Sequence, residues 1–365
     1  MTRRVVVAMS GGVDSSVAAA LLVAQGYEVF GVGMRLPEAE EAVAPGRCCG
    51  MAGMEDARRV AEVIGIPFYV LDYREGFERE VIAPFCRAYA CGQTPNPCVL
   101  CNVQLKFGSL LDKALAWGAD CLASGHYARI EYEAEGKAAL LRGLDYQRDQ
   151  SYFLYSLSAQ RLQHILFPLG NLRKDEVRGI ARRLELPVAD KPGSQDICFV
   201  GPGGYRELLA RRQPQAMQSG PITDLAGTVL GQHRGLAAYT VGQRQGLGIA
   251  AHEPLYVLAL DASRNTVIVG PRHQATTHTL VLKQMNWLLA GPLAEPLKLS
   301  VKTRYRGAAA PAEVIAKGDR VLVHYLEPQP LVAPGQAAVF YEGDRVLGGG
   351  LVASSAMDGE RRVDG

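Results

Sequence analysis

The chain has 365 residues, which is too many for one ordinary hydrophobic core, so we expect two or three domains. Hydrophobic residues make up 48% of it and charged residues 21%, as in ordinary globular proteins. No apolar run approaches the roughly 20 residues that span a bilayer, so no membrane-spanning helix is expected. The formal net charge of +2 neither requires nor excludes a nucleic-acid partner.

Two further features concern the setting of the protein. The N-terminus runs directly into a strand pattern with no signal or transit peptide, so we expect a cytoplasmic protein with no membrane partner. Its eight cysteines all lie in the first 200 residues, at positions 48, 49, 86, 91, 98, 101, 121 and 198. In such a chain this clustering favours metal or thiol chemistry over structural disulfides.

The opening segment predicts an anion-binding loop. A short β-branched run at 5–7 is followed by two glycines and then by a strong helix former from Ser15 to Leu22. A glycine turn between a strand and a helix exposes backbone N–H groups, and the helix dipole favours negative charge there. Hydroxyls of Ser10, Ser15 and Ser16 are expected to add donors. The loop has neither the lysine of a Walker A sequence nor a dinucleotide fingerprint; Ser-Gly-Gly-Val-Asp-Ser-Ser instead resembles the pyrophosphate loop of PP-loop ATPases, although a capped glycine turn is the alternative.

The next segments predict a parallel α/β sheet. Strands are expected at 27–34 and 66–72, with an amphipathic helix at 55–64. Strand–helix–strand units at this spacing favour a doubly wound sheet, whose ligands lie beyond the carboxyl ends of the strands. Met34 is therefore expected beside a nucleotide base, with a core methionine as the alternative. Segment 37–54, with Cys48 and Cys49, predicts a flexible excursion whose role stays open.

The segment 92–102 points to thiol chemistry. Its two prolines keep the approach extended until Cys98, and a helix is expected from Val99 through Lys106 and beyond. Cys101 would then lie in the first turn, where the helix dipole favours a thiolate. Cys198 follows a Pro-Gly turn and is either buried and inert or the spatial partner of Cys101. A single CxxC does not distinguish zinc, redox and iron–sulfur sites.

Three later segments bear on binding. A strand is expected over 118–129, with Gly125 open to a nucleotide and His126 interpreted as a satisfied polar residue rather than a catalytic one. Segment 145–154 carries donors suited to nucleic acid, and the basic helix at 172–184 faces either solvent or phosphate.

After residue 200 short strands are expected at 227–230, 238–241, 255–260 and 266–269, with a linker at 213–221. Strict alternation over 297–306 would place Lys298, Lys302, Arg304 and Arg306 on one strand face, which favours RNA contact over a solvated face.

Six motifs occur in order: Ser-Gly-Gly-Val-Asp-Ser-Ser, Thr94–Asn102, Ala123–Tyr127, Asp149–Leu154, Ser194–Phe199 and Tyr239–Arg244. Together they resemble the bacterial-type tRNA-specific 2-thiouridylases of the PP-loop superfamily over nearly the whole chain. The resemblance implies an α/β, doubly wound parallel-sheet PP-loop domain at 1–207. It also implies a small β-rich domain at 208–275 and a C-terminal β-barrel that contacts tRNA at 276–356, followed by a disordered tail at 357–365.

The resemblance also implies an enzyme, an ATP- and Mg²⁺-dependent sulfurtransferase that adenylates O2 of the anticodon wobble uridine and replaces this oxygen with sulfur. The catalytic residues would be Cys101 and Cys198; Cys198 would carry a persulfide supplied by a sulfur-relay protein or cysteine desulfurase. The implied nucleotide-binding residues are Ala8, Met9, Ser10, Gly11, Gly12, Val13, Asp14, Ser15, Met34 and Gly125. The implied tRNA-binding residues are Asn96, Pro97, Cys98, Arg148, Asp149, Gln150, Arg304 and Tyr305. Turnover would leave a Cys101–Cys198 disulfide for reduction.

The chain departs from some family members at Cys98, where they carry an acid proposed to help proton transfer. This thiol opens an alternative mechanism, because Cys98, Cys101 and Cys198 together suffice to hold a [4Fe–4S] cluster. Otherwise no metal site is expected. Two other classes of function compete: a PP-loop amide ligase, which would not need the three cysteines, and a non-catalytic RNA-binding protein, which would not need the ATP loop.

Overall fold

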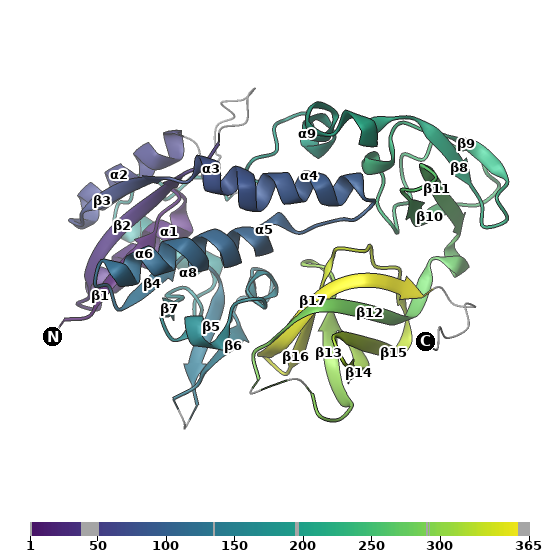
Figure 1. The fold of residues 1–365 in the computed structure, drawn as a ribbon. Helices are drawn as coiled ribbons and strands as arrows, with labels where there is room; N and C mark the ends of the chain where they lie inside the picture. Colours follow the sequence, from purple (N-terminus) through teal and green to yellow (C-terminus); the bar gives the residue numbers. More distant parts are fainter. Residues whose placement is uncertain are drawn as a thin grey trace. The chain divides into compact units, whose positions relative to one another are not determined.

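The computed structural model describes residues 2–37, 51–133, 136–193, 197–289, 291 and 293–356. Cys48, Cys49 and the expected tail at 357–365 lie outside the described residues. Within these ranges, no helix is both long and apolar enough to cross a membrane. The chain divides into two compact units (Figure 1). The first falls within Met1–Ile82, Pro97–Pro202 and Asp344–Leu347, and the second within Ala83–Asn96, Gly203–Gly343 and Gly348–Gly365.

The first unit is built on a parallel sheet with strand order β3-β2-β1-β4-β7. Its strands are β1 (Arg4–Ala8), β2 (Glu28–Arg35), β3 (Phe68–Asp72), β4 (Cys121–Ser124) and β7 (Ile165–Leu166). Because β1 lies at the centre of this order, the loop that follows it opens at the middle of the sheet's carboxyl edge. This is the position where ligands bind in such sheets.

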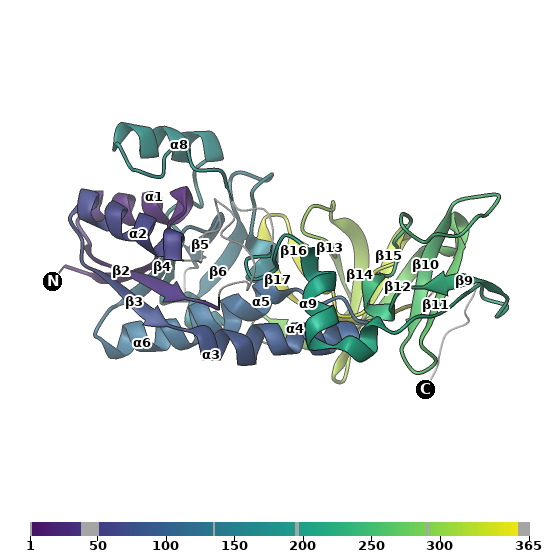
Figure 2. The ribbon, with the colours of Figure 1, turned by 90° about the horizontal axis from the view of Figure 1, so that it is seen from above.

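Helices cover both faces of this sheet. On one face lie α1 (Val13–Ala24), α2 (Met51–Ile64) and α8 (Lys174–Arg183), and on the other lie α3 (Arg74–Phe77) and α6 (Leu111–Ala116) (Figure 2). The same unit contains α5 (Pro97–Leu100), α7 (Ala159–Leu162) and the antiparallel pair β5 (Ala128–Tyr132) and β6 (Ala138–Arg142). At the start of β17, Arg345 pairs with Leu141 of β6.

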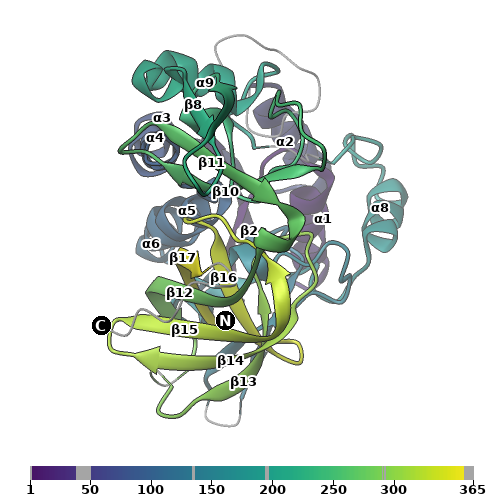
Figure 3. The same ribbon diagram turned by 90° about the vertical axis from the view of Figure 1, so that its right-hand side faces the viewer.

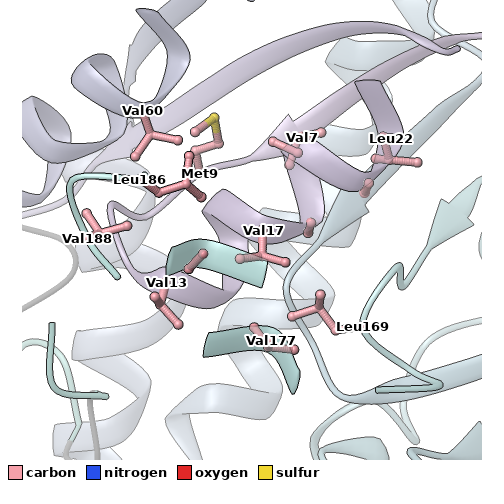
Figure 4. Close-up of a cluster of buried hydrophobic side chains, with 14 of the residues drawn as sticks. Val7, Met9, Val13, Val17, Leu22, Val60, Leu169, Val177, Leu186 and Val188 are labelled. Atoms are coloured by element: carbon pink, nitrogen blue, oxygen red, sulfur yellow. The ribbon is translucent and has the colours of Figure 1, made fainter. Parts of the chain in front are cut away.

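The core of this unit explains the unbroken apolar run of β1. Val5, Val7 and Met9 are at most 2% exposed and pack with Val17 and Leu22 of α1 in one hydrophobic cluster (Figure 4). Val6 is also buried but is not part of that cluster, because alternate side chains of a strand point to opposite faces. A strand buried on both faces is typically a continuous apolar run, as residues 5–7 are here.

The second unit begins with α4 (Ala83–Ala90) and resumes at α9 (Gly204–Arg212). A four-stranded sheet follows, in the order β10-β11-β8-β9. Its strands are β8 (Gly220–Thr223), β9 (Val229–His233), β10 (Leu255–Asp261) and β11 (Thr266–Pro271).

The rest of this unit is a barrel of six strands in the order β12-β15-β14-β13-β16-β17, closed by pairing of β12 with β17 (Figure 3). Its strands are β12 (Thr276–Trp287), β13 (Leu297–Lys302), β14 (Ala310–Lys317), β15 (Arg320–Pro330), β16 (Ala337–Glu342) and β17 (Arg345–Ala356). The predicted architecture, a parallel α/β sheet followed by a small β-rich part and a barrel, is confirmed.

Three strand predictions are wrong, and the strands β6, β7 and β8 were not predicted. The strand expected over 118–129 is interrupted at 125–127, between β4 and β5. Residues 238–241 form no strand; Tyr239 and Val241 are buried in the core, so their alternation reflects burial without ladder pairing. The predicted linker at 213–221 already contains the start of β8. The strand expected over 297–306 ends at Lys302, and a turn follows in which Gly307 N donates to Arg304 O at 3.0 Å.

Candidate functional site

The loop between β1 and α1 is held in shape by its own backbone and hydroxyls. Ser10 N donates to Ser15 Oγ at 3.2 Å. Ser15 Oγ and Ser16 Oγ both donate to Gly12 O, at 3.1 and 2.9 Å, and both residues are buried. In this conformation both hydroxyls therefore donate to the backbone of the loop itself. Ser10 is half-buried, and its Oγ lies 3.4 Å from Ser15 Oγ.

Two glycines make this arrangement possible. Gly11 has φ of +74°, and a Cβ there would lie 1.9 Å from Gly53 O of α2. Gly125, just after β4, is packed so closely that a Cβ would lie 2.6 Å from both Asp14 C and Ser15 N. The first-turn N–H groups of a helix lack intrahelical acceptors, and the residue that precedes α1, Gly12, has no side chain to accept from them. The loop is therefore a compact backbone cradle suited to an anion.

The carboxylate of Asp14 lies in this loop, in the first turn of α1. Asp14 Oδ1 accepts a hydrogen bond from Tyr127 Oη at 2.8 Å and from Lys174 Nζ at 2.6 Å. Burial, together with the neighbouring Asp14 carboxylate, raises the pKa of Tyr127, so this phenol stays protonated and donates. Lys174 is only 16% exposed in its side chain, and its backbone N is fixed by Asp145 Oδ2 at 3.0 Å.

A second lysine supports the other side of the loop. Lys191 Nζ donates to Gly11 O at 2.9 Å and to Asp56 Oδ2 at 2.7 Å. The loop thus lies between two lysines, each paired with a carboxylate. The sequence singles out neither lysine as a site residue, although the basic helix expected at 172–184 is compatible with a face turned toward phosphate.

His126 behaves as the sequence predicted. Its Nδ1 lies 2.7 Å from Ser124 Oγ, and its ring packs among Phe107 and Phe167. Burial, aided by the nearby Lys106, lowers the pKa of His126 well below its usual value, so the imidazole is neutral. It is a satisfied buried residue in this conformation.

The thiol-bearing helix starts two residues earlier than expected. It begins at Pro97 and continues through a π-helical segment, Cys101–Leu110, to α6. Cys101 is consequently its fifth residue and lies just beyond the first turn, which weakens the expected dipole effect on its thiol. Asn102 is buried and donates from Nδ2 to Phe153 O at 3.1 Å, which ties this helix to the 149–153 turn.

Cys98 and Cys198 are exposed and Cys101 is half-buried; all are thiols rather than disulfides. Helix α3 contacts both the segment that carries Cys101 and the segment that carries Cys198. The Phe199 ring packs edge-on against Phe77 at 5.6 Å, and Gly76 lies against Leu105, four residues after Cys101. Both thiols therefore belong to segments that pack on the same short helix of the first unit.

The described residues contain no group of three or more His, Cys, Asp or Glu side chains arranged to hold a metal ion. Cys98, Cys101 and Cys198 thus do not form the ligand set that a [4Fe–4S] cluster needs. The cluster alternative does not fit this arrangement.

The predicted RNA-contacting positions differ in accessibility. Arg148 is exposed and Gln150 half-buried, but Asp149 is 3% exposed. Its oxygens accept from Gly143 N, Ser151 N and Ser151 Oγ at 3.0–3.1 Å. Asp149 therefore stabilises the turn from inside and is not accessible on its surface. Asn96 is half-buried and Pro97 buried.

The four cations expected on one strand face are not together on a strand. Lys298 is exposed on β13, whereas Lys302 is 9% exposed, with Nζ 5.9 Å from the Tyr305 ring centre. Arg304 and Arg306 lie in the following turn, both exposed, and Tyr305 between them is half-buried. One guanidinium N of Arg304 also donates to Leu331 O at 3.1 Å. The basic surface is therefore a turn at the end of β13.

Comparison with known proteins places three family models along the chain. Residues 3–202 match the model described as the tRNA methyl transferase HUP domain. Residues 206–271 match the tRNA methyl transferase PRC-barrel domain, and residues 277–352 the aminomethyltransferase beta-barrel domain.

Curated relatives match nearly the whole length. The protein of Heliobacterium modesticaldum is 48% identical over 357 residues, covering 96% of this chain and 93% of its own. That of Moorella thermoacetica is 49% identical, covering 96% and 99%. Both are named tRNA-specific 2-thiouridylase MnmA.

Among solved structures, U34-tRNA thiolase NcsA from Methanococcus maripaludis with its [4Fe–4S] cluster matches at 19% identity and a TM-score of 0.34, covering 59% of this chain and 66% of that one. A 4-thiouridine synthetase in complex with RNA and bound ATP matches at 14% identity and a TM-score of 0.33, covering 58% and 51%. Similarity at this level carries no functional argument.

Proposed function

The chain belongs to the tRNA-specific 2-thiouridylase family, and from that premise we propose that it replaces O2 of the wobble uridine in tRNA with sulfur at the expense of ATP. The observation that carries the proposal is the presence in one unit of an anion cradle and of two thiol-bearing segments that pack on the same helix, α3. An adenylating site alone does not require thiols, and thiols alone do not require a phosphate loop.

The first step prepares the leaving group. The uridine O2 attacks the α-phosphate of ATP, the bond to the β-phosphate breaks, and pyrophosphate leaves. The loop residues Ala8–Ser15 bind the phosphates through backbone N–H groups, with Met34 and Gly125 on the nucleoside side. Mg²⁺ would offset the charge of the triphosphate, as in other phosphoryl-transfer sites.

The second step delivers sulfur. Cys198 carries a persulfide from a sulfur-relay protein or cysteine desulfurase, and its exposure suits such a delivery. The terminal sulfur attacks C2 of the uridine, and AMP leaves with the former O2. The Cys101 thiolate then attacks Sγ of Cys198 and breaks the S–S bond, which leaves the terminal sulfur on C2. The product is 2-thiouridine, and the Cys101–Cys198 disulfide formed must be reduced by a thiol reductant before the next turnover.

RNA contact in the proposal involves two regions. In the first unit these are Pro97, Cys98 and the turn at 148–150; in the second they are Asn96 and the turn at Arg304 and Tyr305. Exposed cations at Arg148 and Arg304 suit phosphate contact. The tRNA substrate and the need for a reducible disulfide both favour the cytoplasm.

The test is mass spectrometry of tRNA after incubation with ATP, Mg²⁺ and a sulfide source. We expect the mass increase of an oxygen-to-sulfur exchange in wobble-uridine tRNAs. A mass increase matching an added methyl group, or none at all, would reject the proposal.

Substitution of the thiols refines the test. Cys198→Ser and Cys101→Ser are expected to abolish catalytic thiolation while ATP binding survives, because neither side chain is part of the loop. The matched control is Cys91→Ser, another exposed cysteine, which should retain thiolation. Retained turnover in Cys198→Ser would contradict the persulfide step.

A further inference from the structure

The PP-loop of this chain contains no basic residue of its own, yet it holds an acid. No lysine or arginine occurs between Val5 and Ala24, and Asp14 stands in the first turn of α1, where phosphate is expected to bind. An unpaired carboxylate there would repel a triphosphate. Any positively charged side chain at this site must therefore come from elsewhere in the fold.

Lys174 reaches the loop from α8. Its Nζ lies 2.6 Å from Asp14 Oδ1 and 5.9 Å from the centre of the Tyr127 ring, and it is largely buried. Its backbone is fixed at the first turn of α8 by Asp145. An exposed lysine would lose side-chain entropy on binding phosphate, whereas this one is already held in place.

The donor count leaves Lys174 able to bind a ligand. An ammonium has three N–H groups. Within the described part of the chain, Asp14 Oδ1 is the hydrogen-bond acceptor found for Lys174 Nζ. Lys191 differs, because two of its donors are used on Gly11 O and Asp56 and thereby hold the backbone of the loop.

We propose that Lys174 is the phosphate-binding cation of this site: its ammonium binds the pyrophosphoryl end of ATP and stays with pyrophosphate as it leaves. Asp14 and Tyr127 are positioning residues that hold the ammonium beside the start of α1. Negative charge grows on the leaving pyrophosphate during adenylation, and a preorganised cation stabilises that charge. This inference rests on the proposed adenylation, but it does not depend on which group is adenylated.

The experiment compares three ligands on one variant. Lys174→Gln removes the charge but keeps a donor for Asp14, so the loop is expected to stay folded. ATP and pyrophosphate should bind about tenfold to a hundredfold more weakly to it, the range for losing a hydrogen bond to a charged group. AMP, which lacks the pyrophosphoryl end, should bind as it does to the unsubstituted protein. Calorimetry with each ligand, in the absence of tRNA, measures all three.

Two further variants complete the test. Lys174→Arg retains the charge and should restore most of the preference for ATP over AMP. Arg182→Gln removes a charge from an exposed ion pair on the same helix and should change none of the three affinities. Equal weakening of all three ligands in Lys174→Gln would indicate a structural role only, and unchanged affinities would exclude any role; either result overturns the proposal. Because no tRNA is used, the outcome is independent of whether uridine is thiolated.

Discussion

The close contact between Gly125 and the start of α1 gives the sharpest stability prediction. In Gly125→Ala the new Cβ would lie 2.6 Å from Asp14 C and Ser15 N, which real Cβ atoms essentially never show. Both atoms are backbone, so no flexible side chain can move aside. The loop or β4 must shift, at a cost of about 1–3 kcal/mol of unfolding free energy, typical of overpacking.

The same methyl group also acts on the ligand. It would cover Ser15 N, one of the first-turn donors expected to face a phosphate. Loss of one hydrogen bond to a charged group weakens binding roughly tenfold to a hundredfold. We therefore expect Gly125→Ala to bind ATP that much more weakly in calorimetry, and to unfold at lower denaturant concentration.

Gly179→Ala is the matched control. This glycine lies within α8, and a Cβ there meets nothing within 4 Å. Alanine is favoured over glycine inside a helix by about 0.5–1 kcal/mol, so this variant should be slightly more stable and bind ATP normally. If Gly125→Ala matched the unsubstituted protein in both stability and ATP affinity, the packing at the start of α1 would not be as tight as argued.

Two further predictions concern buried polar side chains. Because burial holds the pKa of His126 below its unperturbed value of 6.5, the unfolded chain binds a proton more readily, so stability should fall as pH drops below about 6.5, by at most ~1.4 kcal/mol per pH unit. Denaturation across pH 5–8 measures this, and His126→Asn should flatten the slope; an unchanged slope would contradict the buried neutral imidazole. Asn102→Ala removes the hydrogen bond to Phe153 O and should cost about 1–2 kcal/mol and slow thiolation without weakening ATP binding. Normal thiolation in a destabilised Asn102→Ala protein would remove Asn102 from the positioning of Cys101.

The features predicted correctly from sequence are those set by neighbouring residues. The strand at 4–8, the glycine loop and helix α1 follow from apolar runs and glycines within some twenty residues. The pairing of Lys174 with Asp14 joins residues 160 positions apart, and that of Tyr127 with Asp14 joins residues 113 apart. A charge pattern on a helix does not say which lysine turns toward a distant acid, so this part of the site required the structure.

The end of β13 shows a different limit. Alternation correctly predicts that Lys298 and Lys302 lie on the same face of β13. It does not predict where the strand ends or how far each face of the strand is buried. Lys302 is buried and pairs with Val339 of β16, a strand that comes later in the chain. The turn at Arg304 and Gly307 removes the later cations from the strand.

The turn at 149–153 explains how one short segment serves two parts of the site. On one side Phe153 O accepts from Asn102, next to Cys101. On the other, Gln150 pairs with the backbone of Tyr127 in both directions, at 2.8 and 3.0 Å, and Tyr127 holds Asp14 of the loop. The thiol-bearing helix is thus hydrogen-bonded to one end of this turn, and the loop is linked to the other end through Tyr127. The buried Asp149 holds the turn from within. The mechanism proposed above needs the adenylated base and the thiols in a fixed relation, and this turn links the two segments that would hold them.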